Sequence, residues 1–114
     1  MLINKYTLEV KKSKFIGLLF EINTIDEINI ILSDLKKEHK KARHIPYAYI
    51  LGNIAKKTDD KEPHNTAGIQ IYNELVRNNL NKHLLVIVRY FGGTKLGASN
   101  LLRAYLECAK NCIK

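Results

Sequence analysis

The stretch LLVIVRYFGGTKLGA, residues 84–98, decides the fold of this chain. Residues 84–88 are apolar without alternation, which is typical of a strand at the centre of a sheet that is covered on both faces. Residues 89–97 contain three glycines and break this pattern, and a helix is predicted from Ala98 or Ser99. We therefore expect a core strand, a glycine-rich loop and a final helix in direct succession.

Three segments have the apolar spacing of helices that pack on a sheet. The final helix carries its apolar stripe at Leu101, Leu102, Tyr105, Leu106, Ala109 and Ile113. Residues 69–80 predict a second helix, with Asn65 or Thr66 as its N-cap. Thr24 and Glu27 form a capping box in front of a third helix, which is expected to end near Lys40.

The remaining apolar segments have strand patterns. Residues 7–10 and 14–22 predict a hairpin with its turn at 11–13. Residues 44–51 alternate in polarity, and Pro46 favours a strand start or an edge position. The predicted order of elements is ββαβαβα. Because no repeat or linker is present, we expect a single α+β domain in which helices pack on a mixed sheet.

Length and composition exclude several classes of protein. A chain of 114 residues, 46% apolar and 26% charged, makes one globular domain and excludes a multidomain enzyme. Cys108 and Cys112 are the only cysteines, so no disulfide framework can form and a reducing compartment is favoured. No segment has the apolar length of a signal peptide or a membrane span. We expect a cytoplasmic protein without membrane association.

The net charge of +8 is concentrated in one part of the chain. Fifteen lysines, 14 isoleucines and 11 asparagines indicate AT-rich codons, which raise the total whatever the function. Residues 36–57 hold most of the excess, in Lys36, Lys37, Lys40, Lys41, Arg43, Lys56 and Lys57. Tyr47 and Tyr49 lie among these residues, a pattern typical of RNA binding. The cations would contact phosphates, and the bases would stack on the tyrosine rings. A solvated helix end, with both tyrosines in the core, is the alternative.

The glycine-rich loop suggests a phosphate site. Its glycines permit close approach of backbone N–H groups to an anion, and a helix N-terminus follows. The candidate phosphate-binding residues are Arg89, Gly92, Gly93, Lys95, Gly97 and Arg103. No nucleotide-specific glycine fingerprint is present. The alternative is a tight turn that requires three glycines, with Arg89 and Arg103 paired to acidic residues.

Asp59, Asp60 and Glu62 form an acidic loop before the second helix. Clustered carboxylates can bind a hard cation, but this spacing is not that of a calcium loop, and a helix dipole alone favours acids at this place. The alternative is that these acids cap the helix or form hydrogen bonds within the loop. The four histidines lack zinc spacing, and Cys108 and Cys112 suit small buried core residues. We therefore expect no metal, no cofactor and no catalytic residue, which argues against an enzyme.

Four segments resemble the IMPACT family, including its YigZ-type bacterial members. They are SKFIG at 13–17, Ala42 and His44 with YAY at 47–49, DDKEPHNTAG at 59–68, and RYFGGTKLGASNLLRAY at 89–105. The match extends from about residue 10 to the C-terminus. The motif loop of the family falls on Asp59, Asp60, Glu62, Pro63, Thr66, Ala67 and Gly68. Lys61 departs from the usual glycine and places a positive charge among the carboxylates, which disfavours a metal.

The resemblance implies a two-layer α/β sandwich similar to domain IV of elongation factor G and to the second domain of a small-subunit ribosomal protein. Members of that fold often contact RNA, and eukaryotic relatives regulate translation by binding a protein of translational control. Bacterial relatives commonly carry a second, ferredoxin-like domain. Residues 1–114 would correspond to the IMPACT-type N-terminal domain, without that second domain.

Three functions follow as hypotheses. The first is a non-catalytic, translation-linked regulatory module that binds RNA or the ribosome through its basic face. The second is a protein-interaction module that binds a translational-control partner. The third is a phosphate-ligand-binding protein or enzyme that uses the glycine-rich loop. For the site, we expect Arg89 or Arg103 to lie within salt-bridge distance of Asp59, Asp60 or Glu62.

Overall fold

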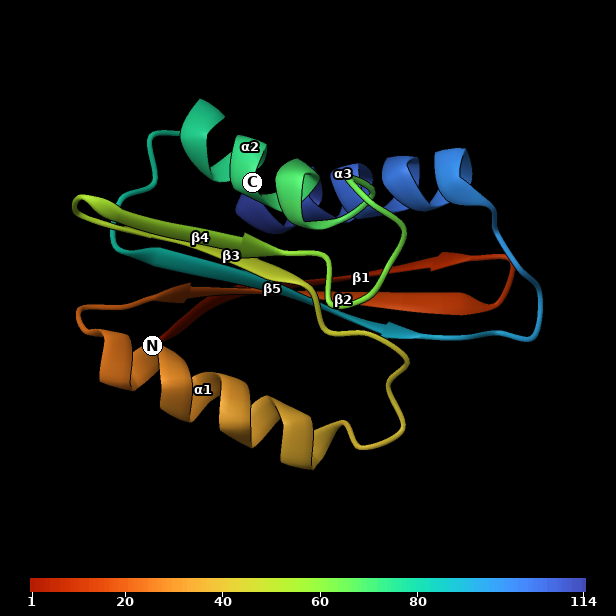
Figure 1. Cartoon of the computed structure of the whole chain (residues 1–114), viewed down its shortest axis with the longest axis horizontal. Helices are drawn as coiled ribbons and strands as arrows, with labels where there is room; N and C mark the ends of the chain where they lie inside the picture. Colours follow the sequence, from red (N-terminus) through yellow and green to blue (C-terminus); the bar gives the residue numbers. More distant parts are fainter.

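Five strands form one sheet in the order β1-β2-β5-β3-β4 in the computed structural model, which describes residues 1–114 (Figure 1). Every neighbouring pair of strands is antiparallel. The elements are β1 Leu2–Val10, β2 Ser13–Glu21, α1 Ile25–Glu38, β3 Tyr47–Leu51, β4 Ile54–Thr58, α2 Gly68–Arg77, β5 His83–Tyr90 and α3 Ala98–Ile113.

β5 is the central strand, as its apolar run predicts. Residues 84–88 are all fully buried. Leu85 and Ile87 belong to a core cluster shared with α2 and α3, whereas Leu84, Val86 and Val88 belong to a second cluster shared with α1. A strand that is apolar on both faces needs cover on both, and these two clusters supply it.

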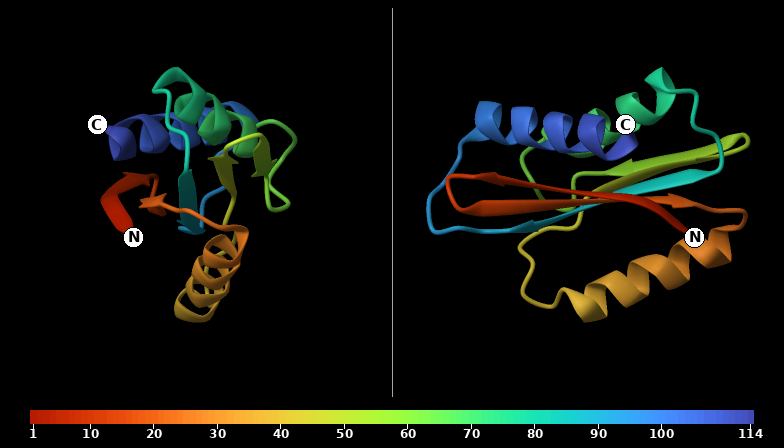
Figure 2. Two further views of the ribbon diagram at one scale, coloured as in Figure 1. Left: turned by 90° about the vertical axis from the view of Figure 1, so that its left-hand side faces the viewer. Right: turned by 180° about the vertical axis from the view of Figure 1, so that it is seen from behind.

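The helices cover the two faces of the sheet separately. Figure 2 shows α1 on one face, with α2 and α3 together on the other. The arrangement has three layers, one more than the expected two-layer sandwich. The physical reason is β5, whose even-numbered and odd-numbered side chains both require apolar partners. None of the three helices has the length and apolar character needed to cross a bilayer.

The α+β class, the first hairpin, the core strand and the final helix are confirmed. The structure adds one strand, β4, so the order is ββαββαβα. β4 is an edge strand whose side chains are exposed or half-buried, so no apolar alternation marks it in the sequence. The sheet is antiparallel rather than mixed, because β5 separates β2 from β3 and runs opposite to both.

Helix starts agree with the sequence in two cases out of three. The amide of Glu27 donates to Thr24 Oγ1 at 3.1 Å, which confirms the cap of α1. α3 begins at Ala98, as predicted. The predicted N-cap of α2, Asn65 or Thr66, is wrong: Ala67 occupies the N-cap position and its side chain makes no capping bond. The side chain that caps α2 instead lies earlier in the acidic loop and is identified with the site.

Candidate functional site

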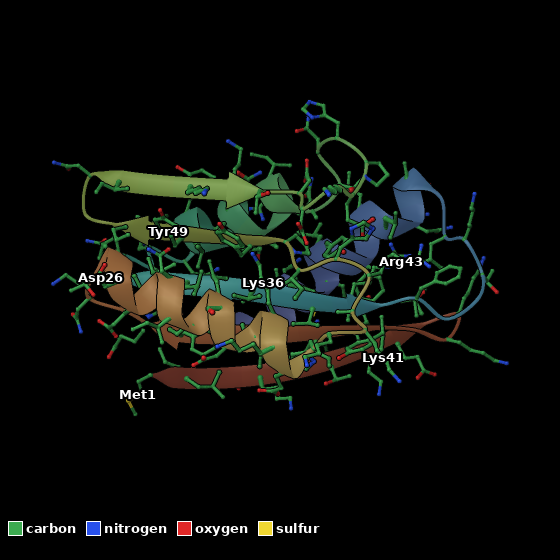
Figure 3. The ribbon with its side chains drawn as sticks, turned by 60° about the horizontal axis from the view of Figure 1, so that its bottom comes forward. Met1, Asp26, Lys36, Lys41, Arg43 and Tyr49 are labelled. Atoms are coloured by element: carbon green, nitrogen blue, oxygen red, sulfur yellow. The ribbon has the colours of Figure 1, made fainter.

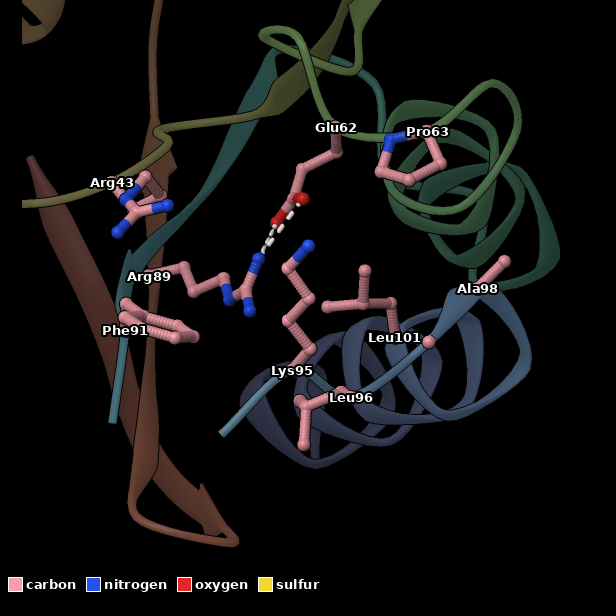
Figure 4. A pocket seen from close by; sticks show the side chains of 10 residues that line it. Arg43, Glu62, Pro63, Arg89, Phe91, Lys95, Leu96, Ala98 and Leu101 are labelled. Atoms are coloured by element: carbon pink, nitrogen blue, oxygen red, sulfur yellow. Dashed lines mark hydrogen bonds and ion pairs between the residues drawn. The ribbon is translucent and has the colours of Figure 1, made fainter. Parts of the chain in front are cut away.

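The acidic loop and the end of β5 meet at a buried ion pair. Glu62 lies between β4 and α2, and Arg89 is the penultimate residue of β5. Arg89 Nη1 donates to both carboxylate oxygens of Glu62, at 3.0 and 2.8 Å (Figure 4). The prediction that Arg89 lies beside this acidic loop is confirmed. The two sequence motifs therefore form one structural unit.

Two further side chains enclose the Glu62 carboxylate. Tyr105, on α3, donates its hydroxyl to Glu62 Oε2, and His44 Nε2 lies 3.5 Å from Oε1. Burial, reinforced by the neighbouring Glu62 charge, raises the pKa of Tyr105 well above its ordinary value, so the hydroxyl remains a neutral donor. With its oxygens engaged, Glu62 holds β5, α3 and the loop together.

The carboxylates of Asp59 and Asp60 accept hydrogen bonds from backbone amides. Asp59 Oδ1 accepts from Ala67 at 3.2 Å and from Gly68 at 2.7 Å, and Oδ2 accepts from Asn65 at 3.1 Å. Asp59 therefore caps α2 in place of Asn65 or Thr66, and the capping alternative for the acidic loop is confirmed. Asp60 Oδ2 accepts from Ile45 at 2.7 Å. The three carboxylates thus bind three different sets of protein donors and do not converge on one point.

The rest of the motif loop makes a tight connection from β4 to α2. The carbonyl of Pro63 accepts from the Thr66 amide at 3.1 Å and from its hydroxyl at 2.6 Å. Thr66 and Ala67 are buried. A Cβ on Gly68 would lie 2.8 Å from the carbonyl carbon of Thr58, so only glycine lets the helix approach the strand this closely. These residues shape the loop that presents Glu62.

The glycine-rich loop packs against the β1–β2 turn. A Cβ on Gly92 would lie 2.1 Å from the carbonyl carbon of Lys12, and the Gly92 amide donates to Ser13 Oγ at 3.3 Å. The φ angle of Gly97 is +79°, immediately before α3. Backbone requirements therefore account for Gly92 and Gly97, as the tight-turn alternative holds for the glycines; of its two arginines, Arg89 is paired with an acid and Arg103 is not. Gly92 and Gly93 do not line the pocket described next.

A cavity of about 270 Å³ lies between the two loops and the start of α3 (Figure 4). Arg89 and Lys95, both candidate phosphate ligands, reach it, and the Lys95 side chain points toward the Glu62–Arg89 pair. The Arg43 guanidinium carbon lies 4.6 Å from the centroid of the Phe91 ring at its margin. The lining residues are Arg43, Glu62, Pro63, Arg89, Phe91, Lys95, Leu96, Gly97, Ala98 and Leu101.

Arg103 and Arg43 occupy places that the sequence did not indicate. Arg103 is exposed, donates to Asn100 Oδ1 at 3.0 Å and lines a different hollow, with Lys110 and Lys114. The prediction that it shares a phosphate site with Arg89 is wrong, because this helical position faces away from the pocket. Arg43 joins the pocket because its amide donates to the Arg89 carbonyl at 2.8 Å, a contact across 46 positions that no sequence pattern shows.

The proposed RNA-binding residues divide into two groups. Lys36, Lys37, Lys40, Lys41 and Arg43 are exposed at the end of α1 and in the segment after it. Figure 3 shows Arg43 on the side of the glycine-rich loop. Lys56 and Lys57 are neighbours on β4 and point to opposite faces, with their Nζ atoms 5.9 Å from the Tyr47 ring centroid and 5.6 Å from that of Tyr72. Lys57 therefore lies on the α2 face of the sheet, apart from the lysines of α1.

The two tyrosines between the basic residues belong to the core of the α1 face. Tyr49 is only 8% exposed, and its ring stacks on that of half-buried Tyr47 with a centroid distance of 6.4 Å. Tyr49 is therefore not available as a platform for bases. For these rings the structure supports the core alternative that the sequence left open.

Cys108 and Cys112 are buried against β2, as expected of small core residues. A Cβ on Gly17 would lie 3.1 Å from Cys108 Sγ and 3.2 Å from Cys112 Sγ. Burial raises the pKa of the Cys108 thiol to about 12 and that of the Cys112 thiol to about 11. Both thiols remain protonated near neutral pH.

Comparison with known sequences bears out the resemblance. The Impact N-terminal domain matches residues 11–113. The IMPACT family member YvyE of Bacillus subtilis is 38% identical over 104 residues, covering 89% of this chain and 48% of that protein. A Haemophilus influenzae member is 33% identical, covering 93% and 54%, and YigZ of Escherichia coli is 32% identical, covering 85% and 50%. The chain thus spans about half the length of these relatives.

Two solved structures share the fold. The crystal structure of a hypothetical protein has a TM-score of 0.91 at 29% sequence identity, over 96% of this chain and 56% of that one. The two-domain translational regulator Yih1 has a TM-score of 0.58 at 18% identity, over 98% of this chain and 45% of that one. The second likeness is one of fold alone.

Proposed function

The chain belongs to the IMPACT family, and from that premise we propose that this domain is a cytoplasmic, non-catalytic module of translational control that binds RNA or the ribosome. The observation that carries the proposal is the exposed basic segment 36–43, fixed against the end of β5. The Arg43 amide donates to the Arg89 carbonyl at 2.8 Å, and the Arg89 amide donates to the His44 carbonyl at 2.9 Å. These bonds fix the backbone at Arg43, where the basic segment ends.

The arrangement favours contact with phosphates over contact with bases. Lys36, Lys37, Lys40 and Lys41 are all exposed, whereas the ring of Tyr49 is buried. Lysines that neutralise phosphates release counterions, so the affinity falls as salt rises and depends little on sequence. The likeness in fold to the translational regulator Yih1 is consistent with this role.

The acidic residues support a non-catalytic role. General acid–base catalysis needs a carboxylate that can reach a substrate proton. Glu62 is enclosed by Arg89 and Tyr105, and Asp59 accepts three backbone amides of its own loop. The structure thus uses these carboxylates to hold its own chain.

Fluorescence anisotropy with a short single-stranded RNA tests the proposal. We expect affinity to fall steeply between about 50 and 200 mM salt. The triple variant Lys37→Glu, Lys40→Glu and Lys41→Glu should weaken binding and reduce the slope of log affinity against log salt by about 0.7 for each phosphate that the variant no longer neutralises. The matched control, Lys82→Glu, Lys110→Glu and Lys114→Glu, has the same net charge change at exposed positions elsewhere.

Two results would overturn the RNA-binding proposal. One is binding that ignores salt, and the other is equal weakening in the test and control variants, which would reflect total charge alone. Affinity capture from native lysate, with and without nuclease, distinguishes RNA binding from the protein-interaction alternative. A partner retained after nuclease treatment would favour the protein-interaction module instead.

A further inference from the structure

We propose that the pocket between Glu62, Arg43 and the start of α3 is a binding site for a phosphate monoester. This proposal shares only Arg43 with RNA binding by segment 36–43, and the lysines of that segment do not line the pocket. Three observations converge on it: a helix N-terminus without a cap, a buried arginine with an unpartnered nitrogen, and two cations without acidic partners.

The first observation is the free N-terminus of α3. Its N-cap residue is Gly97, and no side chain caps the helix. Leu101 is the first residue of α3 whose backbone amide forms a hydrogen bond within the chain, and it donates to the Gly97 carbonyl at 3.0 Å. The amides of residues 98–100 donate to no protein group. Gly97 and Ala98 line the pocket, so the positive end of the helix dipole lies at its edge.

The second observation is the incomplete pairing of Arg89. Its side chain is 7% exposed, and Nη1 alone makes both bonds to Glu62. Nε is buried without any partner. A buried N–H group without an acceptor is rare, because its hydration is removed without replacement. The guanidinium lines the pocket, so an anion bound there would lie beside a buried arginine whose hydrogen bonding is incomplete (Figure 4).

The third observation is the surplus of positive charge in the lining. Arg43 and Lys95 form no ion pair with any acid of the chain, and Arg43 lies over the Phe91 ring instead. The one acid in the lining, Glu62, is already bound by Arg89 and Tyr105. The remaining two cations match a dianion, and guanidinium groups and helix amides are the donors that phosphates favour.

The shape of the pocket indicates an esterified phosphate rather than a free ion. A volume of about 270 Å³ is several times that of one water-sized site, at about 30 Å³. Leu96, Leu101, Pro63 and Phe91 supply an apolar wall beside the cations. The group attached to the phosphate could come from a small phosphorylated molecule or from the end of a nucleic acid, and the experiment distinguishes these two sources.

The test is an NMR titration of the full chain with ribose 5-phosphate, inorganic phosphate, and an RNA oligonucleotide with or without a 5′-phosphate. We expect saturable shifts at the amides of residues 98–100. Lys95→Glu should weaken binding about tenfold, because it replaces an attractive charge in the lining with a repulsive one. Lys110→Glu, exposed on the same side of the sheet but outside the pocket, should leave binding unchanged.

The variants keep the two proposals separable. Lys95 is exposed in a loop, so its substitution tests the pocket without removing the Arg89–Glu62 pair. If the Lys37, Lys40 and Lys41 variant loses RNA binding but still binds ribose 5-phosphate, the phosphate pocket is supported. RNA binding is then assigned to these lysines, outside the pocket. Shifts confined to residues 36–41, or equal affinity in Lys95→Glu and Lys110→Glu, would overturn the phosphate pocket. Shifts at residues 98–100 that need the 5′-phosphate of the oligonucleotide and saturate at lower concentration than with ribose 5-phosphate would assign the source to nucleic acid, and the reverse order to a small molecule.

Discussion

Arg89 and Glu62, 27 positions apart, form an ion pair in which one guanidinium nitrogen serves both carboxylate oxygens. Their side chains are 7% and 2% exposed. A buried pair of this kind contributes little relative to apolar packing, but losing one partner leaves an uncompensated charge in the interior. The pair therefore fixes the geometry of the acidic loop relative to β5, and its removal is a sensitive test of the site.

Glu62→Ala should lower the free energy of unfolding by about 3–5 kcal/mol, because Arg89 would keep a buried charge without a partner. Urea denaturation followed by circular dichroism measures this change. Glu107→Ala, at an exposed position of α3, should stay within about 0.5 kcal/mol of the original chain. A loss in Glu62→Ala no larger than in this control would contradict the role assigned to the pair.

Alkaline pH should destabilise the fold through three buried groups. Burial raises the pKa of Cys108 from 9.0 to about 12 and of Cys112 from 9.0 to about 11, and it raises that of Tyr105 as well. The unfolded chain therefore releases protons that the folded chain retains. Stability should be complete below about pH 9 and fall as pH rises further.

Urea midpoints measured between pH 7 and pH 10.5 would follow this decline, and Cys108→Ala should flatten it. The comparison uses each variant's own value at pH 7 as its reference, since the substitution also removes core volume. If the urea midpoint stays constant or increases as the pH is raised beyond 9, these groups ionise equally in the folded and unfolded chains.

Gly92→Ala should destabilise the chain by about 2–3 kcal/mol, because its Cβ would overlap the backbone at Lys12 in the turn between β1 and β2. Gly52→Ala is the matched control. Gly52 has a φ of +61° but open space around it, so the cost there is backbone strain of about 1 kcal/mol. Thermal unfolding of both variants measures the difference, and equal losses would remove steric overlap as the reason for Gly92.

Asp59→Ala should cost about 1–2 kcal/mol, because α2 would lose the acceptor for its first amides. Asp59→Asn retains one carbonyl oxygen and should recover part of the loss. Asp34→Ala, at an exposed position within α1, provides the control for removing a carboxylate. The cap assignment predicts the order of stabilities in urea; a chain with Asp59→Ala as stable as one with Asp34→Ala would refute it.

The parts of the fold that follow from local pattern could be predicted. The apolar run at 84–88 indicated a central strand, and Thr24 with Glu27 indicated the start of α1. β4 could not be predicted, because an edge strand of exposed side chains has no apolar alternation. The sequence allowed the acidic loop to cap α2 but favoured Asn65 or Thr66 as the N-cap, because Asp59 lies eight and nine positions before the Ala67 and Gly68 amides, outside the local capping pattern.

The candidate site, like the fold, could be predicted only in part. Arg89 and Lys95 were candidate phosphate ligands, and both reach the pocket. Arg103 was grouped with them, but its helical position directs it to another face. Arg43 was assigned to the basic segment, and only its backbone bond to Arg89 brings it to the pocket margin. Which charged groups share a site depends on contacts between distant segments, which residue type and spacing do not encode.

The position of β5 also constrains how the chain assembles during synthesis. β5 is the last strand to be made, yet it lies between β2 and β3 and joins two hairpins. Its pairs span long separations, such as Glu21 with His83, and such contacts form slowly. Until residues 83–90 leave the ribosome, each hairpin presents an unpaired strand edge and no common core exists. Truncated nascent chains of this protein should therefore aggregate or engage chaperones, whereas chains extended through α3 should not.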